Sequence, residues 1–135
     1  MSTAIVIGGG PAGLMAAETM ARAGVEVTVY ERMPSPGRKF LLAGHGGLNL
    51  THSEERQRFV ARYGPSAERL APMLDVFGPE DLREWCADLG EPTFVGSSGR
   101  VFPQAFRATP LFRSWLARQA ELGVRIERRQ RWTGW

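Results

Sequence analysis

The placement of glycines near the N-terminus constrains the fold more than any other feature of this sequence. A short apolar run, residues 4–7, leads directly into Gly8-Gly9-Gly10-Pro11-Ala12-Gly13. An Ala-, Leu- and Met-rich segment, 11–23, ends at Gly24, and residues 25–30 alternate as a second strand should. Strand, glycine turn, helix and strand form a βαβ unit, which requires a parallel sheet. We expect the first strand to be buried on both faces.

The glycine spacing in this turn, G-x-G-x-x-G, is typical of dinucleotide binding when a strand precedes it and a helix follows. Gly8 permits the tight turn, Gly10 lets the backbone approach a pyrophosphate, and Gly13 lets the helix pack closely on the strand. The helix that begins at Pro11 and Ala12 offers unpaired N–H groups and a partial positive charge to phosphates. We interpret the turn as a dinucleotide-binding loop rather than a tight turn without a ligand.

Glu31 stands at the end of the second predicted strand, eighteen residues after Gly13. A carboxylate at this place accepts hydrogen bonds from the ribose hydroxyls of a bound adenosine. It also disfavours a 2′-phosphate, so FAD or NAD fits this position better than NADP. The acidic residue therefore strengthens the prediction of a dinucleotide site.

The rest of the chain divides into segments by the spacing of its glycines, prolines and apolar residues. We expect a βαβ motif over 1–33, a long loop over 34–52, a helical insertion with a hairpin over 53–107, and a helix with a third strand over 108–135. The fold class is α/β, with a Rossmann-like parallel sheet in the order third, second, first strand. The predicted elements of the last two segments are a helix capped by Ser53, helices near 67–77 and 79–90, a hairpin of 93–95 with 100–102, a helix over 109–123 and a strand over 124–127.

The composition is that of an ordinary globular protein, since 43% of residues are hydrophobic and 23% are charged. No apolar run approaches the ~18 residues of a membrane span, so we expect no membrane partner and no signal peptide. A single cysteine, Cys86, excludes an internal disulfide and a cysteine-based zinc site. No other residues are spaced as metal ligands. These features predict a cytoplasmic protein without a metal.

The net charge of +3 includes sixteen arginines and one lysine, Lys39. Seven of the arginines lie between residues 107 and 135, against only Glu121 and Glu127. A basic segment of this kind attracts phosphates, but no recognition-helix pattern accompanies it. We interpret it as a solvated face and expect no nucleic-acid partner, and an RNA partner is the alternative.

Several blocks of the sequence resemble known flavoproteins. Residues 5–14, together with Glu31-Arg32, resemble the N-terminal FAD motif of the two-dinucleotide-binding-domain flavoproteins. Residues 37–51 are more specific and resemble a bacterial family of NAD(P)/FAD-dependent oxidoreductases described as aminoacetone-oxidase-like or bile-acid-reductase-like. Residues 99–103 and 122–124 match further blocks, so the resemblance covers nearly the whole chain. It implies a flavoprotein oxidoreductase that binds FAD, takes electrons from NAD(P)H and acts on a small-molecule substrate.

The resemblance also implies which residues hold the cofactor. Beyond the glycine turn and Glu31, they are Arg32, Gly37, Arg38, Lys39, Gly44, Gly47, Asn49 and Trp132. The charged pair after Gly37 would lie by the pyrophosphate, because arginine binds phosphate with two hydrogen bonds and lysine acts as a point charge. Gly44, Gly47 and Asn49 would lie by the flavin ring, and Trp132 would border the adenine. No catalytic residue is assigned, and we interpret His45 and His52 as loop residues.

The sequence departs from the family pattern in two ways. Many members have Gly-Gly-Arg-Cys-Asn where this chain has Gly46-Gly47-Leu48-Asn49, so chemistry assigned to that cysteine does not carry over. A later Gly-Asp segment that would hold the ribityl chain has no counterpart here. We therefore expect an incomplete domain, the N-terminal part of an FAD/NAD(P)-binding domain, completed by a missing C-terminal segment or by another copy in an oligomer. The alternative is a non-catalytic module that binds FAD or ADP.

Overall fold

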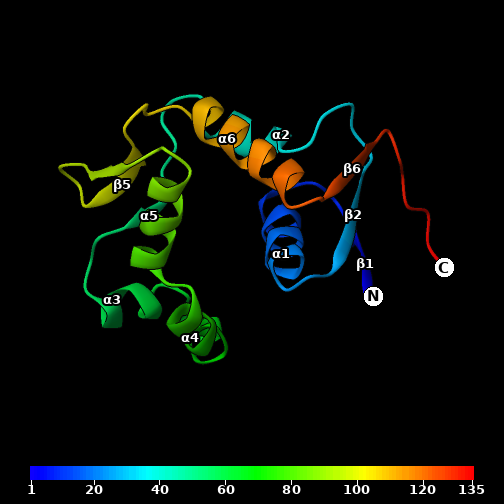
Figure 1. Cartoon of the computed structure of the whole chain (residues 1–135). Coiled ribbons are helices and arrows are strands. Elements are labelled where there is room, and N and C mark those ends of the chain that lie inside the picture. The colour runs from blue at the N-terminus through cyan, green and yellow to red at the C-terminus, as the bar shows by residue number, and fades with distance from the viewer. The chain divides into compact units, whose positions relative to one another are not determined.

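The computed structural model describes all residues, 1–135, and they form two compact units. Unit 1 combines Met1–Ala43 with Phe112–Trp135, and unit 2 comprises Gly44–Leu111. Helix α6 (Ala108–Glu121) is divided between them, since its first turn belongs to unit 2. Figure 1 labels the α-helices of both units and most of their strands.

Unit 1 is built on a parallel three-stranded sheet. Its strands are β1 (Thr3–Ile7), β2 (Glu26–Glu31) and β6 (Arg125–Arg128), in the order β1-β2-β6. Helix α1 (Pro11–Arg22) connects β1 to β2, and both strand pairs are parallel (Figure 1). The α/β fold class, the βαβ motif and the predicted strand order are confirmed.

Polar groups as well as apolar ones hold α1 against α6. The Glu18 carboxylate, only 2% exposed as a residue, accepts a hydrogen bond from the Trp115 indole N–H at 2.9 Å and forms an ion pair with Arg22. The Gln119 amide donates to the Leu14 carbonyl at 2.7 Å. Because a buried carboxylate is costly unless it is paired, this network fixes the two helices of unit 1 in one arrangement.

The expectation that β1 is buried on both faces is wrong. Ala4 and Val6 pack toward the core, but Ile5 and Ile7 on the other face are 67% and 52% exposed. Side chains alternate along a strand, so α1 covers one face of β1 and no element covers the other (Figure 1). An apolar run shows that a strand is present, but it does not show how many layers cover it.

Unit 2 is mostly helical and contains a small antiparallel sheet of order β3-β5-β4. Its elements are β3 (Thr51–His52), α3 (Arg56–Ala61), the 3-10 turn η1 (Gly64–Ser66), α4 (Ala67–Val76), α5 (Pro79–Asp88), β4 (Thr93–Val95) and β5 (Arg100–Pro103). The predicted hairpin is present as β4 and β5, and the helices near 67–77 and 79–90 are present as α4 and α5. The two-residue strand β3 was not predicted.

Two local predictions need correction. The segment 34–52 is not one long loop, because α2 (Arg38–Ala43) lies within it and β3 begins at its end. Helix α3 is capped by Glu55, whose carboxylate accepts a hydrogen bond from the Gln57 N–H at 3.4 Å. The Ser53 hydroxyl, predicted as the cap, instead donates to the Gly99 carbonyl at 3.0 Å. In the first case the glycines and prolines of the segment concealed a short helix. In the second case a hydrogen bond to a residue distant in sequence holds the Ser53 hydroxyl away from the helix.

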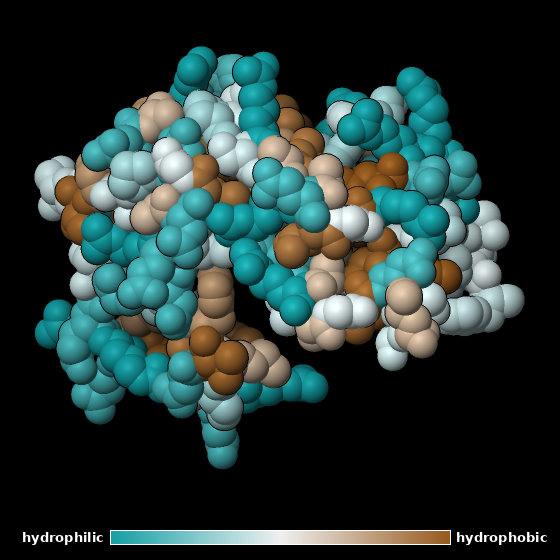
Figure 2. Space-filling view, viewed as in Figure 1, coloured by the Kyte–Doolittle hydropathy of each residue, from teal (hydrophilic) through white to brown (hydrophobic).

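On the face shown in Figure 2, hydrophilic residues surround separate apolar patches. No helix has both the length and the apolar character needed to cross a membrane. The large exposed apolar side chains include Ile5, Ile7 and Leu42 of unit 1 and Met73, Val76, Phe94 and Phe106 of unit 2.

Candidate nucleotide site

Unit 1 contains a cavity of about 670 Å³ at the carboxyl ends of β1 and β2 and the N-terminus of α1. Ligands of open α/β sheets bind at this edge, and the volume lies in the usual range for small-molecule sites. The predicted site residues that line the cavity are Gly8, Gly10, Pro11, Glu31, Arg32, Gly37, Arg38, Lys39 and Trp132. The lining residues that were not predicted from motifs include Ile7, Tyr30, Met33, Ser35 and Leu42.

The glycines of the β1–α1 turn have distinct structural roles. Gly8 has φ of +101°, a backbone conformation that favours glycine. A Cβ at Gly13 would lie 2.0 Å from the Gly8 carbonyl oxygen, so a larger residue there would separate helix from strand. A Cβ at Gly10 would meet nothing within 4 Å, although Gly10 lines the cavity. The protein itself therefore gives no packing reason for glycine at position 10.

The N-terminus of α1 presents free hydrogen-bond donors beside the cavity. The N–H groups of Gly10, Ala12 and Gly13 have no hydrogen-bond partner, and the first helical bond is donated by Leu14 to the Gly10 carbonyl at 2.9 Å. No acidic side chain lies in the first turn of α1. Free N–H groups and the partial positive charge of a helix N-terminus form an anion-binding site.

The Glu31 carboxylate joins the end of β2 to the glycine turn. One oxygen accepts a hydrogen bond from the Gly9 N–H at 2.7 Å, and the other accepts from the Met33 N–H at 3.0 Å. The Gly37 N–H donates to the Gly9 carbonyl at 2.8 Å, so both polar groups of Gly9 are used. A Cβ at Gly9 would lie 2.8 Å from Pro36 Cβ. Gly9, which the motif leaves unspecified, is therefore constrained by the packing of the protein, as Gly13 is.

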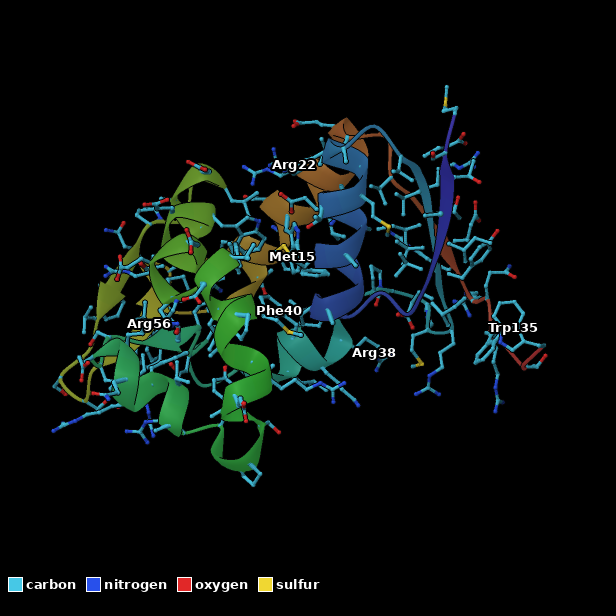
Figure 3. All side chains as sticks on the ribbon, turned by 90° about the horizontal axis from the view of Figure 1, so that it is seen from below. Met15, Arg22, Arg38, Phe40, Arg56 and Trp135 are labelled. Atoms are coloured by element: carbon cyan, nitrogen blue, oxygen red, sulfur yellow. The ribbon has the colours of Figure 1, made fainter.

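Four cationic side chains line the cavity. They belong to Arg32, Arg38, Lys39 and Arg131, and none of them forms an ion pair or a side-chain hydrogen bond within the protein. Glu31 is the only carboxylate in the lining. In Figure 3, Arg38 lies on the side of α2 nearest the β1–α1 turn. The charge balance strongly favours an anionic ligand.

Aromatic packing places α2 within unit 1. The Phe40 ring lies 5.7 Å from the Phe112 ring and 6.1 Å from the Trp115 ring of α6. Gly37, just before α2, has φ of +71°, and a Cβ there would lie 2.2 Å from Phe112. Gly37 therefore lines the cavity and also makes room for the aromatic side chain that fixes α2. The packing of Phe40 leaves Arg38 and Lys39 to face solvent and the cavity.

The residues predicted to lie by a flavin ring belong to unit 2. A Cβ at Gly44 would lie 2.3 Å from Ala108 Cβ, and a Cβ at Gly47 would lie 2.3 Å from the Phe106 ring. Both glycines are explained by close packing inside their own unit. Asn49 lines a second cavity, of about 430 Å³, in the same unit. A role for these three residues at the flavin stays a prediction.

The remaining polar candidates show no catalytic arrangement. The Nδ1 atom of His52 accepts the Glu54 N–H at 3.0 Å, and its Nε2 lies 3.1 Å from the Ser98 carbonyl, so the ring ties two loops together. His45 is exposed. Burial raises the pKa of the Cys86 thiol to about 12, which keeps it protonated and unreactive. No group of three or more His, Cys, Asp and Glu side chains is arranged to hold a metal.

The fold of this chain is shared by solved structures of other proteins. The chain matches a 3-ketosteroid-delta4-(5alpha)-dehydrogenase from Rhodococcus jostii with a TM-score of 0.65 and 19% identity, covering 95% of this chain and 38% of that one. It matches THI4 from Thermovibrio ammonificans with a TM-score of 0.55 and 21% identity, again covering 95% of this chain and 38% of that one. At these identities the likeness shows the fold.

One characterised relative shares closer sequence over a shorter stretch. The chain is 44% identical over 50 residues to a ribosomal RNA dihydrouridine synthase from Haemophilus influenzae. The match covers 37% of this chain and 12% of that protein, so it spans a small part of the relative's length. Residues 2–135, almost the whole chain, match the HI0933-like protein Rossmann domain. The chain therefore belongs to the HI0933-like Rossmann-domain family.

Proposed function

We propose that unit 1 binds FAD through its ADP half, and that the chain is the nucleotide-binding part of an FAD-dependent oxidoreductase. Membership of the HI0933-like Rossmann-domain family supports this proposal. The observation that carries it is Gly10, which lines the cavity and has open space where a side chain would be. A glycine that lines a cavity and has no packing reason within the protein fits a ligand whose phosphates approach the backbone.

The cavity residues fit the two charges of a pyrophosphate. The free N–H groups of Gly10, Ala12 and Gly13 would bind its oxygens, and Arg38 and Lys39 would neutralise it. Each Glu31 oxygen already accepts one backbone N–H, and each has a second lone pair for a ribose hydroxyl. Trp132, with Arg131 beside it, would border the adenine. When bound, FAD would supply the ability to accept and release electrons.

The electron donor and the substrate are finer parts of the same proposal. We propose NAD(P)H as donor and a small molecule as substrate, in a cytoplasmic protein. Reduction of the flavin absorbance by NADH or NADPH, followed anaerobically after FAD is loaded, tests the donor. If neither nucleotide bleaches the flavin while FAD stays bound, the nicotinamide donor is wrong and FAD binding still stands.

The direct test is titration of the purified chain with FAD and with ADP, read by calorimetry and by flavin absorbance retained after desalting. Gly10→Val should weaken both ligands at least ~100-fold, because the side chain fills the space for the pyrophosphate, and the melting temperature should not fall. Gly46→Val is the matched control: Gly46 also has open space at its Cβ, but it does not line the cavity, and ADP affinity should be unchanged.

The comparison of the two ligands also separates the alternatives. If FAD and ADP bind with equal affinity, the chain holds the ADP half alone and behaves as the non-catalytic module. If FAD binds more tightly, the flavin ring also contributes. Unchanged ADP affinity in Gly10→Val would contradict the site itself.

A second candidate function is the reduction of uracil in RNA, which is favoured by the similarity to a ribosomal RNA dihydrouridine synthase. Addition of a hydride and a proton across the C5–C6 double bond of uracil requires a two-electron donor. Reduced flavin supplies such electrons, with NAD(P)H as the final source. Incubation of ribosomal RNA with the FAD-loaded chain and NADPH, followed by mass spectrometry of the nucleosides, should then show dihydrouridine. Its absence under conditions where the flavin is reduced would remove uracil as the substrate of this chain.

A further inference from the structure

One face of the small sheet in unit 2 carries a continuous row of aromatic rings. The centroids of Phe94 and Phe102 are 5.8 Å apart, and those of Phe102 and Phe106 are 5.1 Å apart. Phe94 and Phe106 are 40% and 44% exposed. Aromatic side chains have a large apolar area, and its exposure to water is unfavourable. A row of exposed aromatic rings is therefore unusual and marks a surface that binds a partner.

The register shows that this is the open face of the sheet. Phe94 pairs with Phe102 across β4 and β5, so both side chains lie on the same face. Thr93 pairs with Pro103 on the opposite face, and there the Arg83 side chain of α5 donates to the Thr93 hydroxyl at 2.9 Å. Helix α5 therefore packs on the other face and leaves the aromatic row uncovered.

The same face is basic next to the rings. Arg100 precedes Phe102 by two residues on β5, so its side chain lies on the aromatic face, opposite His52 of β3. Both line the second cavity, of about 430 Å³, together with Asn49, Arg62 and Ser98, and no carboxylate lines it. Arg62 is paired with Glu54, whereas Arg100 has no ion pair or side-chain hydrogen bond. Arg100 is thus a free cation at the edge of an aromatic surface.

The backbone holds the end of the row in place. Phe106 has φ of +63°, a conformation that non-glycine residues adopt at a cost. Its ring covers Gly47, where a Cβ would lie 2.3 Å away, and its carbonyl accepts the Leu48 N–H at 2.8 Å. The exposed ring is fixed by the unit rather than free to turn into the core, which lowers the entropy cost of binding a ligand on it.

We propose that this face of unit 2, formed by Phe94, Phe102, Phe106 and Arg100, binds single-stranded RNA. Unpaired bases stack on the aromatic rings, and a neighbouring phosphate binds Arg100 at the second cavity. Sheets with exposed aromatic rings next to basic side chains suit unpaired bases, because every base has a flat face and every linkage carries a negative charge. The proposal rests on the RNA form of the proposed function and places the polynucleotide on the small sheet of unit 2.

The test measures binding of a labelled, uridine-rich single-stranded RNA to the full chain by fluorescence anisotropy over a series of salt concentrations. Phe94→Ala should weaken binding about tenfold, since one stacked base is lost. Phe77→Ala is the matched control, because Phe77 is equally exposed (39%) but lies outside the row, at the end of α4. Phe94→Leu keeps the apolar area, removes the ring, and should weaken binding nearly as much.

Charge is tested in the same assay. Arg100→Gln should lower the slope of log affinity against log salt by about 0.7, the effect of one lost phosphate contact to a single strand. Arg69→Gln removes an exposed, unpaired arginine of α4 from the same unit and should leave the slope unchanged. Equal effects of the two arginine variants would mean non-specific attraction to the basic chain and would overturn the proposal.

Other results would also overturn it. They are tight binding of the annealed duplex, undiminished binding by Phe94→Leu, or no binding of the single strand at low salt. FAD binding is measured on every variant, because it depends on unit 1. A variant that keeps FAD and loses RNA supports the RNA face. If the wild-type chain binds RNA but does not bind FAD, the flavin proposal is refuted and the RNA-binding face still stands.

Discussion

The two units use glycine for different purposes, although both contain glycine-rich turns. In unit 1, Gly10 borders a cavity and has empty space where its side chain would be. In unit 2, Gly44 and Gly47 are pressed against Ala108 and Phe106. A glycine in the sequence therefore does not show by itself why a side chain is absent. The structure shows whether the protein packs against that position or leaves open space at a cavity.

The difference also separates stability from binding within one turn. Gly10 and Gly13 are three residues apart, yet Gly13 is required by the Gly8 carbonyl oxygen of the protein itself. Substitution at Gly10 should therefore affect affinity alone, and substitution at Gly13 should affect the fold first. Unit 2 offers the corresponding packing glycine, Gly44, outside the nucleotide cavity.

The largest effect that would test this comparison is expected from Gly13→Ala. Its Cβ would meet backbone, which yields less than a side chain, so we expect the free energy of unfolding to fall by about 3 kcal/mol or more. Gly44→Ala, whose Cβ would meet a methyl group and neighbouring backbone, should cost about 1–3 kcal/mol. Urea unfolding measures both.

Binding then distinguishes the two variants. Gly44→Ala should keep wild-type ADP affinity at temperatures where it is folded, and Gly13→Ala should lose it with the fold. If Gly13→Ala is as stable as the wild type, the close packing of α1 on β1 is not as described.

A smaller effect is expected from Glu31→Gln. The amide keeps one acceptor, so one of the two backbone N–H groups, of Gly9 or Met33, loses its partner. We expect a loss of about 1–3 kcal/mol in stability, and weaker binding of ADP. Glu26→Gln on the same strand removes an exposed ion pair with Arg125 and should cost at most about 1 kcal/mol, with ADP affinity unchanged. Similar ADP affinities in both variants would show that Glu31 only joins the strand to the turn.

The last effect concerns unit 2 and is absent at neutral pH, because it appears only under alkaline conditions. Burial holds the pKa of Cys86 near 12 in the folded chain, against about 9 when it is exposed. The unfolded chain releases this proton first, so folding stability should fall as the pH rises through about 9, by up to about 1.4 kcal/mol per pH unit. Cys86→Ala should flatten that part of the profile, and iodoacetamide should label the wild type only when it is unfolded. Rapid labelling of the native chain at pH 8 would contradict the burial of Cys86.

Much of unit 1 could be predicted from the sequence because its signals are local. The apolar run, the glycine spacing and the acidic residue at 31 all lie within one βαβ unit, and nine predicted residues line one cavity. The exposure of Ile5 could not be predicted, because an apolar strand looks the same whether one or both faces are covered. Gly37 was predicted for the ligand, yet its contact with Phe112, seventy-five positions away, also requires it.

Unit 2 was harder because its organisation depends on contacts between distant segments. A two-residue strand such as β3 is too short to show the alternation of apolar and polar residues that predicts a strand. It forms because it pairs with β5. The packing of Gly47 under Phe106 joins residues fifty-nine positions apart. The sequence drew attention to RNA only through the arginines near the C-terminus. The structure points instead to Phe94, Phe102 and Arg100 of the β4–β5 hairpin, because its register places their side chains on one face.

The uncovered face of β1 has a practical consequence for work with the purified chain. β1 is an edge strand, with unpaired backbone groups on one side and Ile5 and Ile7 exposed on its surface. Such an edge invites a second strand, so the colloidal stability of this chain should depend steeply on concentration. Ile5→Thr keeps the β-branched shape that suits a strand and reduces the exposed apolar area of β1. We expect this variant to be more soluble and to keep the nucleotide cavity intact.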